Sequence, residues 1–201
     1  MRKRPAKAEI QAIYDVKVEV LGELERMSER SEIDVVYADA ARVSANAGVP
    51  YGWQFPDEDG FMPSTPGAGI NCFAFLTRTN QCRFATTRDS ITSQFVLEQV
   101  EHFSVGLPKL TVLVLDNAPV HTAKMIQERR AAWEERGLFV VYLPRYAPHL
   151  NIVETLWRKL KHEWLAPEDY ETTEGLCSTV RQALAAVGTR LCINFSKFSL
   201  S

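Results

Sequence analysis

Cysteine is scarce in this 201-residue chain, and its few cysteines do not form a metal-binding pattern. No two cysteines stand three positions apart, and no histidines lie at the spacing that a structural zinc site requires. The four cysteines are Cys72, Cys82, Cys177 and Cys192. We therefore predict reduced thiols in a cytoplasmic protein, with a Cys72–Cys82 bridge across a hairpin as the less favoured alternative.

Long hydrophobic runs are also absent. The longest apolar runs, residues 110–115 and 138–143, are far shorter than the roughly 20 residues needed to cross a bilayer. No apolar segment of the secretory type follows the basic residues 2–7. We therefore expect no membrane association and no secretion.

Charge of one sign is not in excess, because the formal net charge is −2. Any nucleic-acid binding must therefore depend on local basic patches. Hydrophobic residues make up 46% of the chain and charged residues 24%, a composition typical of a folded globular domain. We expect one central unit over residues 33–168, a basic helical lead over residues 1–32, and a C-terminal helix and tail over residues 169–201 packed on the same unit.

The hydrophobic pattern predicts an α/β protein, a mixed sheet flanked by helices. In the first helix, Ile13, Val16, Val20 and Leu24 recur at helical spacing and are expected to form its apolar face. Residues 56–69 are rich in Pro, Gly, Asp and Ser and are expected to form a loop. The expected helices are 8–30, 91–103, 121–136, 151–165 and 173–187, and the expected strands are 33–38, 70–77, 83–87, 111–115 and 138–143.

Three acidic residues occupy positions where an α/β protein places its active site. Asp39 follows the first expected strand, Asp116 follows the fully apolar strand 111–115, and Glu154 lies in the first turn of a helix. Active sites of open α/β sheets lie at the carboxyl ends of strands, so these carboxylates converge if the two strands are neighbours.

A cluster of three carboxylates is stable chiefly when a cation neutralises it. Oxygen ligands without cysteine favour Mg²⁺ or Mn²⁺. Two such ions support in-line phosphoryl displacement, the chemistry of nucleases and strand transferases. An ordinary structural interpretation stays open, in which Asp39 is a turn residue and Glu154 a favourable carboxylate at a helix N-terminus.

Two longer motifs favour the catalytic interpretation. Residues 115–121 read LDNAPVH and residues 143–157 read LPRYAPHLNIVETLW, with VYAD at 36–39 and YGW at 51–53. Together they resemble the catalytic core of mariner-related bacterial insertion-sequence transposases, the insertion sequence 630 family, over about residues 33–165.

This resemblance implies a ribonuclease-H-like fold and an Asp-Asp-Glu (DDE) triad on Asp39, Asp116 and Glu154. It implies a DDE transposase that cleaves and joins DNA with two Mg²⁺ or Mn²⁺ ions. The alternative is a truncated or inactive transposase-derived DNA-binding protein. A homodimer on DNA is expected from the same resemblance.

The sequence departs from the family pattern at several places. Ala40 stands where an acidic residue usually follows the first Asp, and residues 148–152 read PHLNI where Pro-Glu-Leu-Asn-Pro is usual. About 32 residues precede the first expected strand, too few for the family's helix-turn-helix region. Two explanations stay open: a separate helix-turn-helix polypeptide binds the DNA ends, or the chain is a truncated remnant.

The motifs contain further candidate residues. Supporting roles are expected for Asn117, His121, Tyr146 and Asn151, where turn, structural and helix-capping roles are the alternatives. The helix that carries Glu154 is basic beyond it, and a phosphate-contacting face competes there with an ordinary solvated face. The candidate DNA-binding residues are Arg158, Lys159 and Lys161.

Overall fold

The structure is a computed structural model, and it describes residues 7–44, 68–196 and 198. Strands and helices alternate along the chain after a long first helix. The strands are β1 (Asp34–Ser44), β2 (Gly69–Leu76), β3 (Cys82–Thr87), β4 (Thr111–Leu115) and β5 (Leu138–Tyr142). The α-helices are α1 (Lys7–Glu29), α2 (Ser93–Phe103), α3 (Pro119–Thr122), α4 (Lys124–Glu135), α5 (Val153–Lys159) and α6 (Thr173–Ala186).

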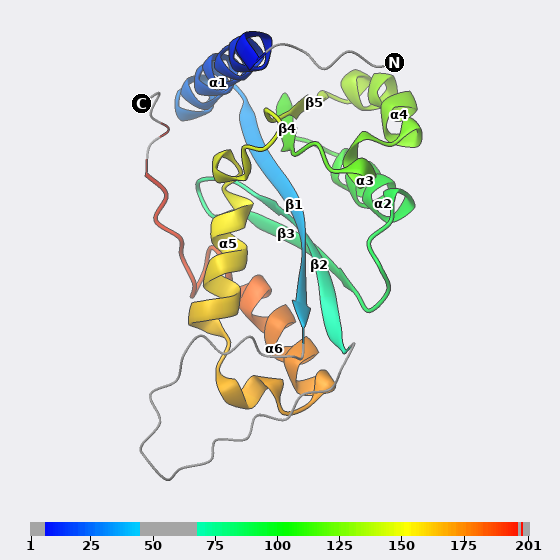
Figure 1. The fold of residues 1–201 in the computed structure, drawn as a ribbon, viewed down its shortest axis with the longest axis vertical. Coiled ribbons are helices and arrows are strands. Elements are labelled where there is room, and N and C mark those ends of the chain that lie inside the picture. Colours follow the sequence, from blue (N-terminus) through cyan, green and yellow to red (C-terminus); the bar gives the residue numbers. More distant parts are fainter. Residues whose placement is uncertain (1–6, 45–67, 197, 199–201) are drawn as a thin grey trace.

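The five strands form one mixed sheet in the order β3-β2-β1-β4-β5. β1, β2 and β3 are antiparallel neighbours, whereas β4 is parallel to both β1 and β5. Figure 1 shows α2, α3 and α4 on one side of this sheet and α5 and α6 on the other, with α1 at the end where β1 begins. The expected mixed sheet flanked by helices is confirmed, and it has the ribonuclease-H-like architecture.

Each face of the sheet buries its own apolar cluster because side chains alternate along a strand. Tyr37 and Val114 point toward the face covered by α1, α5 and α6. Leu113 and Leu115 point toward the opposite face, where Trp133 of α4 is fully buried. All five residues of β4 are buried, as expected for a central strand covered on both faces.

The first strand is longer than the sequence pattern predicted. β1 continues through Asp39 to Ser44, so Asp39 lies inside a strand and not after its end. The reason is that β1 has two different neighbours. Its pairing with β4 ends at Tyr37, but its antiparallel pairing with β2 extends to Ser44.

The apolar face predicted for α1 was wrong for three of its four residues, since only Leu24 packs, partly buried, against the core. Ile13, Val16 and Val20 are between 47% and 59% exposed. Leu21 and Glu25, on another side of the helix, are buried instead. Helical periodicity alone therefore did not identify the side of the helix that packs.

Three other helix boundaries differ from the expectation. The expected helix 91–103 begins at Ser93, and Thr92 caps it by accepting a hydrogen bond from the Phe95 amide. The expected helix 121–136 is divided at Ala123 into α3 and α4. The expected helix 151–165 begins at Val153 and changes from α-helix to π-helix at Leu160. Short 3-10 helices precede α5 and α6 at Pro148–Leu150 and Pro167–Tyr170.

Some sequence predictions lie outside the described residues. The YGW motif at 51–53 and nearly all of the expected loop 56–69 fall in this group. The four cysteines are free, and Cys72 pairs in register with Thr86 rather than with Cys82. Among the described helices, none is both long and apolar enough to span a membrane.

A buried ionic contact fastens α1 to the sheet. Glu25 is 5% exposed, accepts a hydrogen bond from the Tyr37 hydroxyl, and forms an ion pair with Arg78 at 2.8 Å between Nε and Oε1. Burial raises the pKa of Tyr37 well above its ordinary value, and the Glu25 carboxylate adds to this shift. The hydroxyl therefore stays protonated and donates to the carboxylate.

We expect Arg78→Ala to lower the free energy of unfolding by about 3 kcal/mol, because it leaves the buried Glu25 carboxylate without its cation. Arg26→Ala is the matched control, since Arg26 pairs with Glu23 on the same helix at an exposed site. This control should change stability by less than about 1 kcal/mol. Urea denaturation measures both values, and equal effects would contradict the assigned role of the buried pair.

Candidate active site

The pairing of β1 with β4 places two of the predicted acids side by side. Tyr37 and Val114 are the last register pair of the two strands, and Asp39 and Asp116 each follow two residues later. The two acids are near enough for the Asp116 charge to raise the pKa of Asp39. Neighbouring strands are about 4.8 Å apart, and the two acids point to the same face of the sheet because they share the same alternation. The expectation that their strands are neighbours is confirmed.

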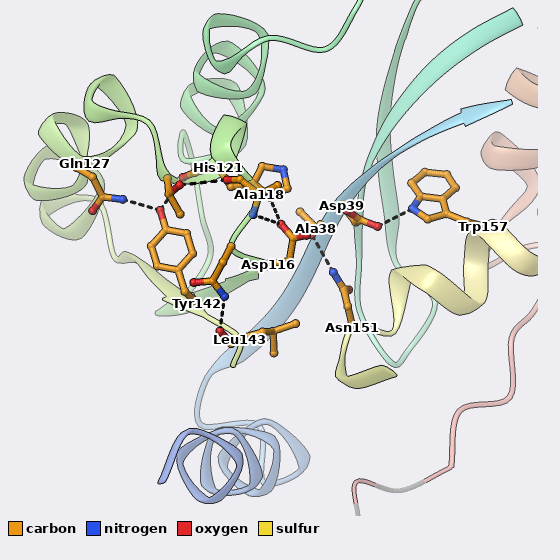
Figure 2. A network of polar contacts seen from close by, with 12 residues as sticks. Ala38, Asp39, Asp116, Ala118, His121, Gln127, Tyr142, Leu143, Asn151 and Trp157 are labelled. Atoms are coloured by element: carbon orange, nitrogen blue, oxygen red, sulfur yellow. Dashed lines mark hydrogen bonds and ion pairs between the residues drawn. The ribbon is translucent and has the colours of Figure 1, made fainter. Parts of the chain in front are cut away.

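Asp116 lies directly after β4 and is held by two donors. Its Oδ1 accepts hydrogen bonds from the Ala118 amide at 2.9 Å and from His121 Nδ1 at 2.5 Å (Figure 2). His121 is 1% exposed, and its carbonyl accepts a hydrogen bond from the Tyr142 hydroxyl. The imidazole is therefore a fixed positioning group for Asp116, because its Nδ1 has to carry the proton that the carboxylate accepts.

Asp39 is connected to the helix that carries the third acid. The Trp157 indole of α5 donates to Asp39 Oδ2 at 3.1 Å, and Figure 2 shows the Asp39 carboxylate turned toward this ring. Next to it, the Asn151 amide donates to the Ala38 carbonyl at 3.2 Å. These two bonds fix the N-terminal end of α5 against β1.

The Asn151 side chain makes two hydrogen bonds at the start of α5, and its supporting role in the site stays a prediction. Its Oδ1 accepts a hydrogen bond from the Val153 amide, and its Nδ2 reaches β1. It is 3% exposed, so burial of this amide is possible because both of its polar atoms are bonded.

Glu154 lies in the first turn of α5 and is exposed. It precedes Trp157 by three residues, so the two side chains share one face of the helix. Glu154 is close enough to Asp39 for its charge to raise the pKa of that residue. The helix thus carries Glu154 toward the two strand acids.

The two strand acids have opposite pKa shifts. Burial raises the pKa of Asp39 to about 6, the Glu154 and Asp116 carboxylates add to the increase, and the Ala40 amide opposes it. Burial also disfavours the charged form of Asp116, but the hydrogen bonds from His121 and Ala118 outweigh it and lower that pKa. Asp116 is therefore ionised at neutral pH, while Asp39 ionises only as the pH rises past about 6.

The oxygen donors of the three acids suit a divalent cation. Repulsion between carboxylates is the condition that a Mg²⁺ or Mn²⁺ ion relieves, and these ions prefer oxygen ligands. The three acids, however, are not close enough together to form a complete set of metal ligands. Among the residues that the structure describes, no three His, Cys, Asp or Glu side chains are grouped so that they could hold an ion.

A cavity of about 420 Å³ lies beside Asp116. It extends along Asn117 and the loop after β5, which includes Arg145 and Tyr146. Asn117 donates to the Leu143 carbonyl at 2.6 Å and so ties the loop to the end of β4. The structural role of Asn117 is therefore visible in the fold.

A lysine of α1 supports the same loop. Lys17 Nζ donates to the carbonyls of Tyr142 and Leu143 at 2.7 and 3.1 Å. Burial lowers the pKa of Lys17, and the charge of Arg145 lowers it further. Tyr14 of α1 also contacts His149, with 3.2 Å between its hydroxyl and Nε2. The first helix thus forms part of the structure that surrounds the site.

The candidate DNA-binding residues do not form one free basic face. Lys159 pairs with Glu163 at 2.6 Å, and Lys161 lies near enough to Cys72 to influence its pKa. Arg158 is exposed on the surface of α5. A role in DNA binding stays a prediction for all three.

Sequence reasoning missed Lys17 and the contact between Trp157 and Asp39. A buried indole N–H needs an acceptor, so the position of Trp157 three residues after Glu154 was an available indication. Nothing in the sequence around Lys17 indicated its contact, because the carbonyls that it binds lie more than 120 residues away.

Asp39→Asn should stabilise the protein at pH 7.5 without added metal. The wild-type pKa of about 6 exceeds the ordinary 3.8, so ionisation is disfavoured in the fold and wild-type stability falls as the pH rises from about 4 to about 6. Asparagine cannot ionise and keeps an oxygen for Trp157. We expect a gain on the order of 1–3 kcal/mol at pH 7.5 and none at pH 3.5, measured by urea denaturation in EDTA. Equal gains at both pH values would contradict the assigned cause.

His121→Leu should raise the pKa of Asp116, because it removes the hydrogen bond that favours the carboxylate. Carboxyl ¹³C chemical shifts followed against pH measure this value. Gln127→Ala is the control, since Gln127 donates to the Tyr142 hydroxyl in the same network but does not contact Asp116. An unchanged Asp116 pKa in the His121 variant would show that the imidazole does not set it.

The fold is similar to those of solved transposase and integrase structures. The Mos1 transposase paired-end complex with left transposon end superposes with a TM-score of 0.65 at 16% identity, covering 92% of this chain and 57% of that one. The Mos1 mariner paired-end complex with Mn gives a TM-score of 0.64 at 15% identity, covering 92% and 60%. The simian T-cell lymphotropic virus intasome, in complex with a PP2A regulatory subunit, gives 0.53 at 13% identity, covering 76% and 47%.

The chain spans a little more than half the length of the Mos1 chains that it matches. No curated protein sequence gives a significant match. A family model described as DDE superfamily endonuclease matches residues 34–177, which include β1, β4 and α5 with all three candidate acids. The chain therefore belongs to the DDE superfamily endonuclease family.

Proposed function

We propose that this chain is the catalytic part of a DDE transposase, and that Asp39, Asp116 and Glu154 form its catalytic triad. The observation that carries the proposal is the parallel pairing of β1 with β4, whose last pair, Tyr37 and Val114, stands two residues before Asp39 and Asp116, with α5 fixed to β1 by Trp157 and Asn151. We further propose that it belongs to the insertion sequence 630 branch of mariner-related elements, on the basis of the LDNAPVH and LPRYAPHLNIVETLW motifs.

The proposed reaction has two phosphoryl transfers. In the first, a water oxygen attacks the phosphorus at an element end, and the bond from phosphorus to the 3′ oxygen breaks. This leaves a 5′ phosphate, and the released 3′ oxygen takes up a proton in place of the one that the water loses and becomes a free 3′ hydroxyl. In the second, that 3′ oxygen attacks a phosphodiester of the target, loses its proton, and displaces another 3′ oxygen. Both steps are in-line displacements, so no covalent enzyme intermediate is needed.

The three acids would hold two Mg²⁺ or Mn²⁺ ions in this proposal. Such ions lower the pKa of the attacking hydroxyl and stabilise charge on the leaving oxygen. Asp116 is prepared for the role because His121 and Ala118 keep it ionised. Burial and the neighbouring carboxylates disfavour the ionisation of Asp39, so a bound cation would favour its charged form more than that of Asp116. Glu154 would approach from α5.

DNA is the proposed partner, both as element end and as target. Sequence-specific binding of element ends needs a recognition element in a groove, and we propose a separate helix-turn-helix polypeptide for this task. A homodimer on DNA would bring two ends together. These proposals concern a complex of protein and DNA, and this chain matches only part of the transposase chains found in such complexes.

The test is metal-dependent cleavage and joining of supercoiled and oligonucleotide DNA by the purified chain. We expect activity with Mg²⁺ or Mn²⁺ in the wild type and a loss of roughly a hundredfold or more in Asp116→Ala and Glu154→Ala. Glu135→Ala is the matched control, because Glu135 is an exposed acid at the end of α4. Circular dichroism establishes that each variant is folded.

A second readout does not depend on turnover. Added Mg²⁺ should raise the melting temperature of the wild type but not of Asp116→Ala. Metal-independent cleavage, or full activity in either triad variant, would contradict the proposal. If the wild type is inactive, activity restored by a helix-turn-helix partner would indicate a split enzyme. Failure to restore activity would favour the transposase-derived DNA-binding protein.

A further inference from the structure

An uncovered aromatic ring stands beside the candidate active site. Tyr146 is 98% exposed, and its backbone is left-handed, with φ of 62°. This conformation is unfavourable for a residue with a side chain, and such positions concentrate at functional sites. Pro144 and Ala147 on either side are buried, so the loop is anchored while the ring is presented to solvent.

The ring borders the cavity that also contains Asp116. This cavity of about 420 Å³ has the size of a small-molecule site, roughly 300–1,000 Å³. Its floor is stable because Asn117 and Lys17 both donate to the Leu143 carbonyl. A group stacked on Tyr146 would therefore lie next to the acid that we place in the triad.

The same loop carries an available positive charge. Arg145 is exposed and lines the cavity, and no ion pair to it occurs within the described part of the chain. Lys17 lies close behind it, near enough for Arg145 to influence its pKa. An exposed aromatic ring beside a cation suits a ligand that has a flat base and an anionic backbone.

We propose that Tyr146 is a stacking platform for an unpaired nucleobase beside the reacting phosphodiester, and that Arg145 contacts the adjacent phosphate. The proposal rests on the DNA-binding part of the proposed function and adds which form of DNA the site takes. Stacking on one face of an exposed ring requires a base outside the duplex. The substrate at this position is therefore a single-stranded or flipped nucleotide.

The probe is a single-stranded oligonucleotide of about 12 nucleotides with one central 2-aminopurine, compared with the same strand in a duplex. Titration with the full chain in EDTA prevents cleavage. Stacking should quench 2-aminopurine emission in the single strand more than in the duplex. Tyr146→Ala should lose the quenching and bind about tenfold more weakly, whereas Tyr146→Phe should behave as the wild type.

Two matched controls separate the site from general effects. Phe139→Ala removes another exposed aromatic side chain, at the opposite end of β5, and should leave quenching unchanged. Arg145→Ala should reduce the slope of log Kd against log salt by about 0.7, the effect of one phosphate contact on a single strand. Arg190→Ala, an exposed arginine after α6, should leave the slope unchanged.

Absence of quenching with the wild type, or wild-type quenching by Tyr146→Ala, would overturn the proposal. A change of sedimentation mass in Tyr146→Ala with unchanged DNA binding would also overturn it and would assign the ring to a protein contact. Plasmid cleavage measured in parallel separates the two proposals. Cleavage without quenching refutes only the stacking platform. Tyr146-dependent quenching without cleavage, also after addition of a helix-turn-helix partner, refutes only the catalytic function.

Discussion

The parallel pairing of β1 with β4 is the constraint on which the rest of the site depends. Its last pair, Tyr37 and Val114, stands two residues before Asp39 and Asp116, so the pairing brings the two acids together although 77 residues separate them in the chain. A shift of one residue would turn one acid to the other face of the sheet. The fully buried β4 opposes such a shift, because both of its faces are packed.

The two strand acids are electrostatically different although they are neighbours. His121 and Ala118 supply hydrogen bonds that keep Asp116 charged, whereas Asp39 lies in a more buried place beside two other carboxylates. The difference in pKa arises from the groups around each carboxylate, since both residues are aspartates. It gives one carboxylate that is charged before any cation binds and one whose charge depends on its surroundings.

Helix α1 stabilises the surroundings of the site although it lies at the start of the chain. Its buried Glu25 is fixed by Tyr37 of β1 and by Arg78, and Lys17 binds the carbonyls at the end of β5. The apolar periodicity of α1 did not reveal these contacts. Polar residues make the decisive interactions of this helix, and a hydrophobic pattern carries no information about their partners.

Strand and helix positions followed closely from the sequence where the apolar pattern was continuous. The strand at 111–115 was predicted with its observed bounds. β3 and β5 differ from the prediction by one residue at one end, and β2 by one residue at each end. The bounds of a strand were predicted less well where its length depends on the neighbouring strand. β1 reaches Ser44 because β2 lies beside it, and the partner of a strand is not encoded near the strand itself.

The sequence alone determined the α/β class, the three candidate acids and the motifs that connect them to DDE enzymes. These features are local, since they depend on residue type and short spacing. Only the tertiary structure decided that Asp39 lies within a strand that pairs with the strand before Asp116, that Trp157 and Asn151 fix α5 to β1, and that Tyr146 stands uncovered beside the site. Each of these relations joins residues far apart in the chain or depends on what surrounds a side chain. They are set by packing of the whole fold, which no single segment specifies.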